Sequence, residues 1–398
     1  MDFLDFRDTK SINNFLEYFN NRQRRLASPK LLEHKDILNA LDLISLHNGK
    51  FRPPKCSMIN KNSTKKKRYI FIYPEEETLL LKYYNYIISR KDLGIHKFCI
   101  SFQPGSKVYN TIKKLQSPSL HRFFCIKLDI ENYFNSIDIS SIHEWIPKEL
   151  LNQDINQLIL NETILNPKVI VKGEVVNMKM KGVMAGIPIA PLLSNLYLAD
   201  FDEELSNLYP FYVRYADDML IFCKEEQVQP CLELVEKLLM HKKLKINFGK
   251  TKVAKPGLGF DFLGLFIKPN CIDLSENTKL KMKSKIKRQS RRYHRRISKG
   301  ELQIDKAIYY MNLKFKRKWY GKNADSTEFT WAYFFFPLIT TTNGLKEIDQ
   351  YYQRQVRTLP TGKNRKSNYK RVPYRKLVEL GYIPLVSSYY KTFENKIN

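Results

Sequence analysis

The chain has few of the residues that build zinc sites and disulfide frameworks. Its 398 residues include 6 cysteines and 7 histidines. No two cysteines have Cys-x-x-Cys spacing, and no paired histidines stand nearby, so neither a zinc site nor a set of disulfides is indicated. Cys125 and Cys223 lie in apolar runs and are expected to be small core residues. Reduced thiols suit the cytosol.

Long hydrophobic runs are also missing. The longest apolar stretch, residues 329–339, is interrupted by Pro337 and is too short to cross a bilayer. The opening residues MDFLD form neither a charged segment nor an apolar core of the kind found in a leader peptide. We therefore expect a cytoplasmic protein without a membrane partner.

Acidic residues are scarce relative to basic ones. The chain has 68 Lys and Arg against 40 Asp and Glu, a formal net charge of +28 and a pI near 9.6. Such a balance favours binding to a polyanion, and nucleic acid is the first candidate. There is no internal repeat and no long Gly/Ser linker. At this length the chain is expected to divide into two or three lobes.

Acidic residues occur at two places that strand patterns would fix. Asp217 and Asp218 stand in the sequence YADD, between the apolar runs 211–213 and 219–222, which predicts a carboxylate pair on a hairpin turn. Adjacent acids in a turn are more often solvated residues that help the chain reverse. However, Asp129 ends a second strand pattern at 123–130. Two strand-borne acidic sites together favour metal-dependent phosphoryl transfer.

The acids suit a site for two Mg²⁺ ions, with Mn²⁺ as an alternative. Two-metal phosphoryl transfer uses oxygen ligands that bridge ions about 3.5–4 Å apart. Asp129 and Asp217 are the expected bridging ligands, and the carbonyl of Ile130 would add one oxygen. Whether Asp218 binds metal or only tunes the local field stays open.

The order of the motifs around these acids carries a resemblance. Residues 127–138, KLDIENYFNSID, are similar to a first palm motif, and residues 182–198 are similar to a glycine-proline loop that leads into a helix. The chain resembles bacterial reverse transcriptases of the group that includes group II intron, retron and defence-associated enzymes. The resemblance covers about 65–267.

The resemblance implies an α+β fold of right-hand polymerase architecture. The fingers would occupy residues 1–121 and the palm, an antiparallel sheet with helices, residues 122–270. A basic helical thumb and C-terminal RNA-binding region would occupy residues 271–398.

Several nucleotide-binding residues are implied by the same resemblance. Phe134 is the expected steric gate against a ribose 2′-hydroxyl, its alternative being a core aromatic. Gly186 would let the loop backbone approach the nucleotide. Ala185 stands where relatives usually have a glutamine that contacts the incoming nucleotide, which bears on template choice. Lys67 and Arg68 would lie over the triphosphate, unless they belong to a generic solvated patch.

Two further motifs follow downstream. Lys250 is expected near the pyrophosphate leaving group, where a cationic acid would assist departure; the alternative is a surface lysine at a strand edge. Phe262, Leu263 and Gly264 resemble a primer-grip hairpin.

Residues 275–277 are predicted to cap a basic helix that spans 279–296. Met282, Ile286, Tyr293 and Ile297 would form its packed stripe. Four basic residues of this helix are expected to follow a template-primer duplex through its phosphates: Lys283, Lys287, Arg291 and Arg295. A solvated basic face is the alternative. Amphipathic spacing predicts further helices at 34–46 and 229–240.

Aromatic and basic residues alternate at 314–320 and 363–371, which suits stacking on unpaired bases. The alternative is that Trp319, Trp331 and the phenylalanines at 334–336 are core residues.

The resemblance implies an RNA-directed DNA polymerase that copies a partner non-coding RNA into cDNA with a primer and dNTPs, with a role in antiphage defence. Class 2 defence-associated enzymes are the nearest comparison. No His-Asn-His or zinc cluster follows the thumb and no ribonuclease H acids follow the palm, which favours a stand-alone enzyme. Two alternatives remain. One is a different polymerase, which adds nucleotides without a template or synthesises RNA, and the other is a maturase-like RNA-binding protein. The oligomeric state stays open.

Overall fold

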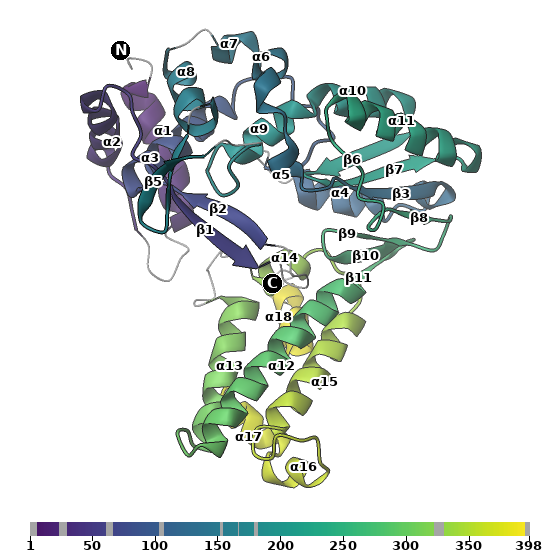
Figure 1. Cartoon of the computed structure of the whole chain (residues 1–398). Coiled ribbons are helices and arrows are strands. Elements are labelled where there is room, and N and C mark those ends of the chain that lie inside the picture. Colours follow the sequence, from purple (N-terminus) through teal and green to yellow (C-terminus); the bar gives the residue numbers. More distant parts are fainter. Residues whose placement is uncertain are drawn as a thin grey trace. The chain divides into compact units, whose positions relative to one another are not determined.

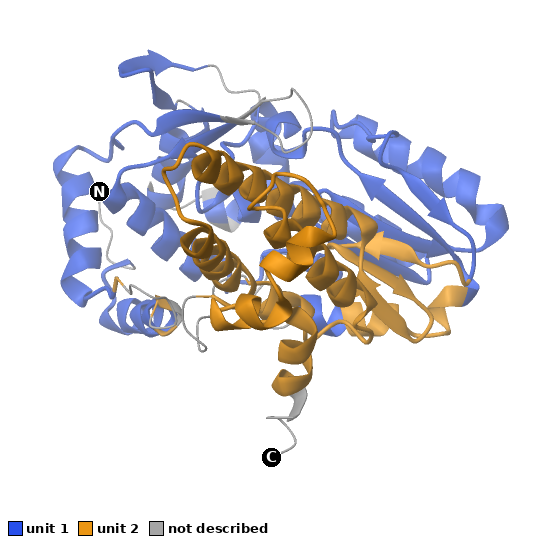
Figure 2. Ribbon diagram, turned by 90° about the horizontal axis from the view of Figure 1, so that it is seen from below, with its two compact units in different colours: residues 1–20, 31–111, 122–256 blue, residues 21–30, 112–121, 257–398 orange. Residues whose placement is uncertain are grey.

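The computed structural model describes residues 6–23, 30–60, 67–102, 107–151, 154–165, 167–178, 182–321 and 330–394. The chain forms two compact units, coloured in Figure 2. Unit 1 comprises residues 1–20, 31–111 and 122–256, and unit 2 comprises residues 21–30, 112–121 and 257–398. The regions expected to be fingers and palm thus share unit 1, and the units divide after residue 256 instead of 270. The division into three functional regions stays a prediction.

The central sheet of unit 1 has four strands, labelled in Figure 1. They stand in the order β6 (Phe211–Tyr215), β7 (Asp218–Cys223), β3 (Phe124–Asp129) and β8 (Lys252–Ala254), and every neighbouring pair is antiparallel. Apolar side chains fill β7, whose residues from Met219 to Cys223 are all buried. The two strands predicted to carry the acids are therefore confirmed, and they are direct neighbours.

A second sheet of unit 1 has the order β2 (Lys67–Ile72), β1 (Lys55–Asn60), β4 (Lys168–Val171) and β5 (Glu174–Asn177). β1 is antiparallel to β2 and parallel to β4. The motif at 65–72 is confirmed as a strand from residue 67 onward. Lys65 and Lys66, where the resemblance begins, lie outside the described residues, as do residues 103–106.

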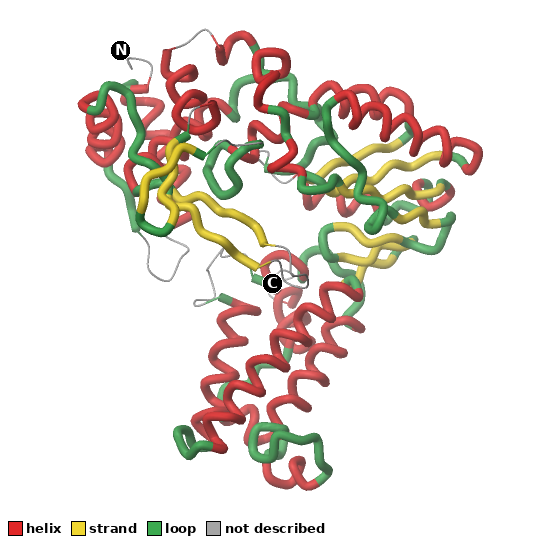
Figure 3. Tube along the Cα trace, viewed as in Figure 1, coloured by secondary structure: helices red, strands yellow, loops and turns green. Residues whose placement is uncertain are grey.

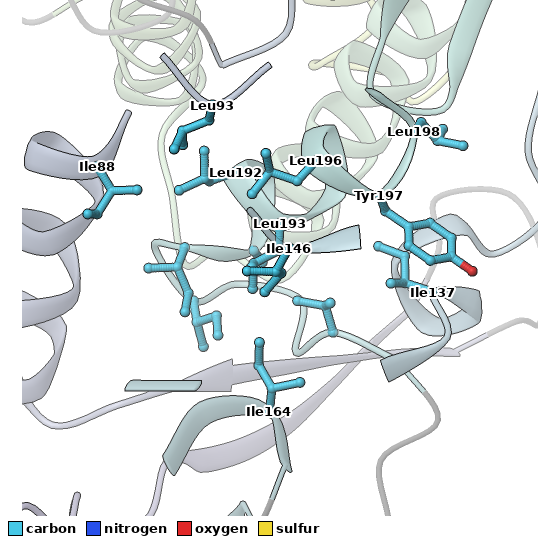
Figure 4. Packing of buried hydrophobic residues seen from close by; sticks show 14 of the residues in the cluster. Ile88, Leu93, Ile137, Ile146, Ile164, Leu192, Leu193, Leu196, Tyr197 and Leu198 are labelled. Atoms are coloured by element: carbon cyan, nitrogen blue, oxygen red, sulfur yellow. The ribbon is translucent and has the colours of Figure 1, made fainter. Parts of the chain in front are cut away.

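Helices and helical turns accompany these sheets. In chain order they are α1 (Thr9–Gln23), α2 (His34–Leu46), α3 (Glu75–Ile88), α4 (Lys107–Leu115), η2 (Leu120–Arg122), α5 (Tyr133–Ser136), η3 (Ile139–Ser141), α6 (Ile142–Trp145), α7 (Lys148–Leu151), α8 (Asp154–Leu160), η4 (Asn161–Leu165), α9 (Ala190–Tyr197), α10 (Ala199–Leu208), η5 (Glu225–Gln227) and α11 (Val228–His241). The helices predicted at 34–46 and 229–240 are confirmed as α2 and α11. In Figure 4, Leu192 and Leu193 of α9 lie close to Leu93 and Ile146 in the unit 1 core.

Unit 2 joins a small sheet to a group of helices. Its strands have the order β11 (Cys271–Leu274), β10 (Leu265–Lys268) and β9 (Phe260–Phe262). Its helices are α12 (Glu276–Ser298), α13 (Ile304–Tyr320), α14 (Trp331–Phe335), α15 (Asn343–Arg357), α16 (Ser367–Arg371), α17 (Tyr374–Glu379) and α18 (Leu385–Glu394). α12 packs against both α13 and α15, and all three are long (Figure 3).

The predicted basic helix is α12. The hydroxyl of Ser275 accepts a hydrogen bond from the Thr278 N–H, so the predicted cap is confirmed. Met282, Ile286 and Tyr293 are buried along the packed stripe, whereas Ile297 is only half-buried.

Aromatic residues form the core of unit 2. The ring of Trp319 lies 5.4 Å from Phe315 and 5.0 Å from Tyr352, and all three side chains are buried. Trp331, Phe335 and Phe336 are buried too. The core interpretation is therefore confirmed for Trp319, Trp331 and the phenylalanines at 335 and 336, whereas Phe334 is only half-buried. The expectation that residues 314–320 stack bases is wrong for Phe315 and Trp319. Large apolar rings are stabilised more by packing than by an exposed position.

All six cysteines are free thiols, and Cys125 and Cys223 are buried as expected. Among the described residues, no helix has the length and apolar character needed to cross a membrane.

Candidate active site

The YADD sequence forms a tight turn between β6 and β7. Tyr215 pairs with Asp218, so Ala216 and Asp217 make the reversal. Ala216 has φ +55°, a left-handed backbone that residues with a side chain seldom adopt. The surrounding structure must therefore hold this turn.

A buried arginine holds it. Arg214 is fully buried, and its Nη1 donates to the Ala216 carbonyl at 3.2 Å. Its Nε and Nη2 donate to the two carboxylate oxygens of Asp202, at 2.7 and 2.6 Å. The Tyr212 hydroxyl donates to the same carboxylate at 2.6 Å. Each charge is thus offset by a partner inside the protein, which burial requires.

The Arg214 backbone extends this network to the segment that precedes α4. Its N–H donates to the Phe98 carbonyl at 3.0 Å, and its own carbonyl accepts from the Ile100 N–H at 2.9 Å. Asn195 of α9 donates to the Ser101 carbonyl at 2.8 Å. The sequence reasoning missed Arg214 and Asp202. The available signal was a charged residue inside the apolar run 211–223.

The strand register brings the acids together at one edge of the sheet. Asp129 and Asp218 are directly opposite each other on β3 and β7. The Ile130 N–H donates to the Asp217 carbonyl at 3.2 Å, which ties the turn to the end of β3.

Asp129 is paired with Lys250. The Lys250 Nζ lies 2.8 Å from both carboxylate oxygens, and Asn247 Nδ2 donates to one of them at 3.0 Å. Lys250 is therefore at the acidic edge, as expected for a group that acts there. The Lys250 side chain is also 58 % exposed, which agrees with the alternative that it is a surface lysine.

Burial gives Asp218 a raised pKa. Its pKa is raised to about 6, mainly by burial and less by the charges of Asp217 and Asp129, while Lys127 opposes the shift. Lys127 Nζ forms an ion pair with Asp218 Oδ1 at 3.2 Å. Among the described residues, that buried oxygen has no partner with the geometry of a hydrogen bond. A cation bound near such a carboxyl group would stabilise its charged form.

The donors agree with a divalent metal by type and by strand position. Carboxylate oxygens are the ligands that Mg²⁺ prefers, and the unbonded Asp218 Oδ1 is a buried acceptor of that kind. No group of three or more His, Cys, Asp or Glu side chains is already arranged around a common metal position in the part of the chain that the structure describes. Instead, Lys127 and Lys250 form ion pairs with Asp218 and Asp129. Ligation by Asp129, Asp217, Asp218 and the Ile130 carbonyl stays a prediction.

The residues expected near the nucleotide lie on three segments of unit 1. Phe134 is half-buried, and its carbonyl accepts from the Val183 N–H at 2.9 Å. Tyr133 beside it is buried, which fits the core interpretation. Ala185 is buried, and its carbonyl accepts from the Phe71 N–H at 3.0 Å.

Gly186 lets the loop backbone lie close to a neighbouring group. In the structure that neighbour is β2, whereas the sequence predicted a nucleotide. The φ of Gly186 is +105°, and a Cβ there would lie 2.7 Å from Ile70 Cγ2. The backbones of Lys67 and Arg68 pair with β1, and their side chains lie outside what the structure describes. Nucleotide contacts by these residues stay predictions.

In unit 2, the predicted primer-grip residues do form a hairpin turn. Leu263 and Gly264 connect β9 to β10 with φ values of 47° and 84°. A Cβ on Gly264 would lie 2.8 Å from Thr278 Oγ1, so this glycine allows the hairpin to contact α12. Phe262 is fully buried and acts here as a packing residue. Contact with a primer stays a prediction.

α12 carries a basic groove of about 380 Å³. Its lining residues are Ser284, Lys287, Arg288, Arg291 and Arg295. Three of the four predicted basic residues are therefore together, and Arg288 is an addition that the sequence reasoning missed.

Lys283 does not line that groove, and its expected contact with nucleic acid stays a prediction. It forms an ion pair with Glu347 of α15, and Nζ lies 5.7 Å from the Tyr351 ring. Lys279, then Lys283, lowers the pKa of Glu347. Position 283 faces α15 because it is one residue, about 100° of helix rotation, away from the groove position Ser284.

Residues 59–267 match the family described as "Reverse transcriptase (RNA-dependent DNA polymerase)". The chain belongs to the reverse transcriptase family. The match begins within β1 and ends in β10, so it includes Asp129, Asp217 and Asp218. Reverse transcriptases generally use divalent metal ions, which agrees with the donor type at the sheet edge.

This reverse transcriptase chain is also similar to individual proteins. It is 25% identical to the retron Ec83 reverse transcriptase of Escherichia coli over 174 residues, which are 42% of this chain and 50% of that protein. The chain thus spans about half the length of this curated relative.

Solved structures with some likeness include apo telomerase from Candida tropicalis (TM-score 0.44, 10% identity, 83% of this chain and 68% of that chain). Telomerase from Candida albicans in complex with a telomeric RNA fragment gives a TM-score of 0.39 at 13% identity, covering 83% of this chain and 62% of that chain.

Proposed function

We propose that the protein is an RNA-directed DNA polymerase that copies a partner non-coding RNA into cDNA. The observation that carries this proposal is the direct pairing of Asp129 with Asp218 beside the Asp217 turn, in a chain of the reverse transcriptase family. The basic groove on α12 supports a nucleic-acid substrate.

The proposed reaction is attack of a primer 3′-hydroxyl on the α-phosphate of a dNTP, with release of pyrophosphate. Asp129, Asp217 and Asp218 would hold two Mg²⁺, with the Ile130 carbonyl as a further ligand. Bound metal would supply an activated attacking oxygen and a stabilised leaving oxygen.

The other roles belong to the chain's own residues. The exposed ammonium group of Lys250 stands at the acidic edge and is the proposed proton donor to the departing pyrophosphate. Phe134 would exclude a ribose 2′-hydroxyl. Arg214 keeps the turn in its left-handed conformation through the Ala216 carbonyl. Holding the acids in place before substrate binds reduces the reorganisation needed for reaction.

The biological setting is part of the proposal. The likeness to a retron reverse transcriptase supports a resident RNA template, a DNA product and a role in antiphage defence. Membership of the class 2 defence-associated enzymes is a further part of this proposal.

Template-independent synthesis is the second candidate, and Ala185 is the observation in its favour. Its side chain is a buried methyl, which cannot offer the polar contact that a glutamine would make. A primer-extension assay that supplies one dNTP at a time would distinguish the two candidates. On poly(rA) with an oligo(dT) primer, templated synthesis uses dTTP only, whereas untemplated addition accepts other dNTPs.

The test of the main proposal is primer extension on that template with Mg²⁺, comparing wild type with Asp217→Asn. Glu236→Gln is the matched control, because Glu236 is an exposed acid on α11. We expect dTTP incorporation by wild type and the control and none by Asp217→Asn. Equal incorporation by all three would contradict the proposal.

A further inference from the structure

A basic loop connects α15 to α17 in unit 2. It spans residues 360–371, includes α16, and exposes five cations: Lys363, Arg365, Lys366, Lys370 and Arg371. None of the five is paired with an acid among the described residues, although the nearby Arg375 and Lys376 are. The loop thus gathers positive charge without local compensation.

Buried hydrogen bonds keep this loop in one conformation. Asn368 is fully buried, and its Nδ2 donates to the Lys363 carbonyl at 2.8 Å and to Thr361 Oγ1 at 3.1 Å. The Gly362 N–H donates to the Thr358 carbonyl at 2.7 Å. A single buried amide side chain of α16 is therefore tied to the start of the basic segment.

The loop is also docked on α12. The Nδ1 of His294 lies at hydrogen-bond distance, 2.8 Å, from the Leu359 carbonyl. Gly362 has φ +69°, and a Cβ there would lie 2.3 Å from His294 Nε2, so only glycine allows this contact. His294 immediately precedes Arg295 of the basic groove. The loop thus adjoins the C-terminal part of that groove.

An aromatic ring is presented beside the cations. Tyr369 is 50% exposed, and the guanidinium carbon of Arg357 lies 4.6 Å from its ring centroid. Arg357 is itself buried and donates from Nε to the Val372 carbonyl at 3.1 Å. The ring is therefore supported from within the protein while half of it stays open.

Keeping such a loop ordered has a cost. Fixing one residue's backbone costs about 1–2 kcal/mol, and like charges add repulsion. An anionic ligand would offset both. The exposed ring favours a ligand that has flat bases as well as phosphates, because bases stack on aromatic side chains and lipid headgroups do not.

We propose that the basic loop and Tyr369 form a second RNA-binding site, for unpaired RNA, beside the α12 groove. The groove would follow a duplex, while the loop retains a single-stranded or hairpin-loop part of the template RNA. This inference rests on the proposed function, in that it names how the partner RNA is held between rounds of synthesis.

The test uses the full-length protein and oligo(U) as the probe. The loop variant is Lys363→Gln/Arg365→Gln/Lys366→Gln, and the matched control is Lys91→Gln/Lys148→Gln/Lys237→Gln, three exposed lysines of unit 1. Loss of three phosphate contacts should reduce the slope of log K against log salt by about 2 and weaken binding about 10–100-fold at low salt. The control should keep the wild-type slope.

Tyr369→Leu gives an independent readout. Loss of one stacked base should weaken oligo(U) binding about 5–150-fold and leave the salt slope unchanged. Wild-type affinity and slope in both the loop variant and Tyr369→Leu would overturn the proposal. Loss of binding to phosphatidylserine vesicles with unchanged oligo(U) binding would overturn it too, in favour of a lipid.

Catalysis is measured separately. At saturating poly(rA) and oligo(dT), the maximal rate of extension should persist in the loop variant and disappear in Asp217→Asn, whereas oligo(U) binding should show the reverse pattern. If wild type makes no DNA, the proposed function fails while the binding comparison still decides the role of the loop.

Discussion

Asp202→Asn should destabilise unit 1 because it leaves the Arg214 charge without its partner. Both side chains of this ion pair are fully buried. Removing one partner of a buried pair costs about 3–5 kcal/mol. For a unit of this size, such a loss lowers the melting temperature by about 6–20 °C.

The control is Asp200→Asn, two residues away. The Asp200 carboxylate is 70% exposed and pairs with Lys242 at 2.8 Å, so its loss should cost about 0–1 kcal/mol. Urea unfolding and thermal melting of the full-length protein measure the difference between the variants. Equal stability of Asp202→Asn and Asp200→Asn would refute the reasoning.

The double variant Asp202→Leu/Arg214→Met separates stability from positioning. Replacing both partners of a buried ion pair by apolar residues is often neutral for stability. The variant nevertheless lacks the donor to the Ala216 carbonyl, so we expect recovered stability with low kcat in primer extension. Full recovery of kcat would show that Arg214 has no positioning role.

Three further predictions concern single residues. Lys250→Ala should lower kcat about 100-fold with little change in the KM for dNTP, whereas Lys250→Arg should retain more activity; single-turnover extension measures both, and an unchanged kcat would count against a proton donor. Phe134→Ala should reduce discrimination against ribonucleotides about 10–200-fold, measured as the ratio of kcat/KM values for dNTP and rNTP, and an unchanged ratio would remove Phe134 as the gate. Burial raises the pKa of Asp349 above 3.8, although hydrogen bonds from the Leu385 and Val386 N–H groups and the Tyr382 hydroxyl oppose the shift. The neutral form of Asp349 is therefore favoured in the folded state, and the stability that Asp349 contributes falls as pH rises through the raised pKa. Asp349→Asn should therefore flatten that part of the pH dependence of urea unfolding, and an identical slope in wild type and variant would contradict the assignment.

Local patterns predicted the strands β3, β6 and β7 and the helices α2, α11 and α12. The runs at 211–213 and 219–222 are apolar enough to form a hairpin wherever the chain places them, and the acids at their ends follow from the register. α2 and α12 are amphipathic over more than three turns, so their apolar positions determine their buried faces.

Local sequence patterns do not identify partners that are distant in the sequence. Arg214 is stabilised by Asp202 twelve positions earlier, and nothing in the local pattern names that partner. Lys283 looks like its basic neighbours until Glu347 of α15 packs against it. Phe315 and Trp319 alternate with basic residues, yet burial in the unit 2 core decided their role. In each case tertiary packing overrode a local signal.

The central claim is acid-dependent copying of a bound RNA. The most direct measurement is to purify the protein with the nucleic acid that it retains, add Mg²⁺ and labelled dNTPs, and sequence RNA and DNA beside Asp217→Ala/Asp218→Ala. We predict DNA complementary to one retained RNA in wild type and none in the double variant. Retained RNA without any acid-dependent DNA would contradict the claim and leave RNA binding as the function.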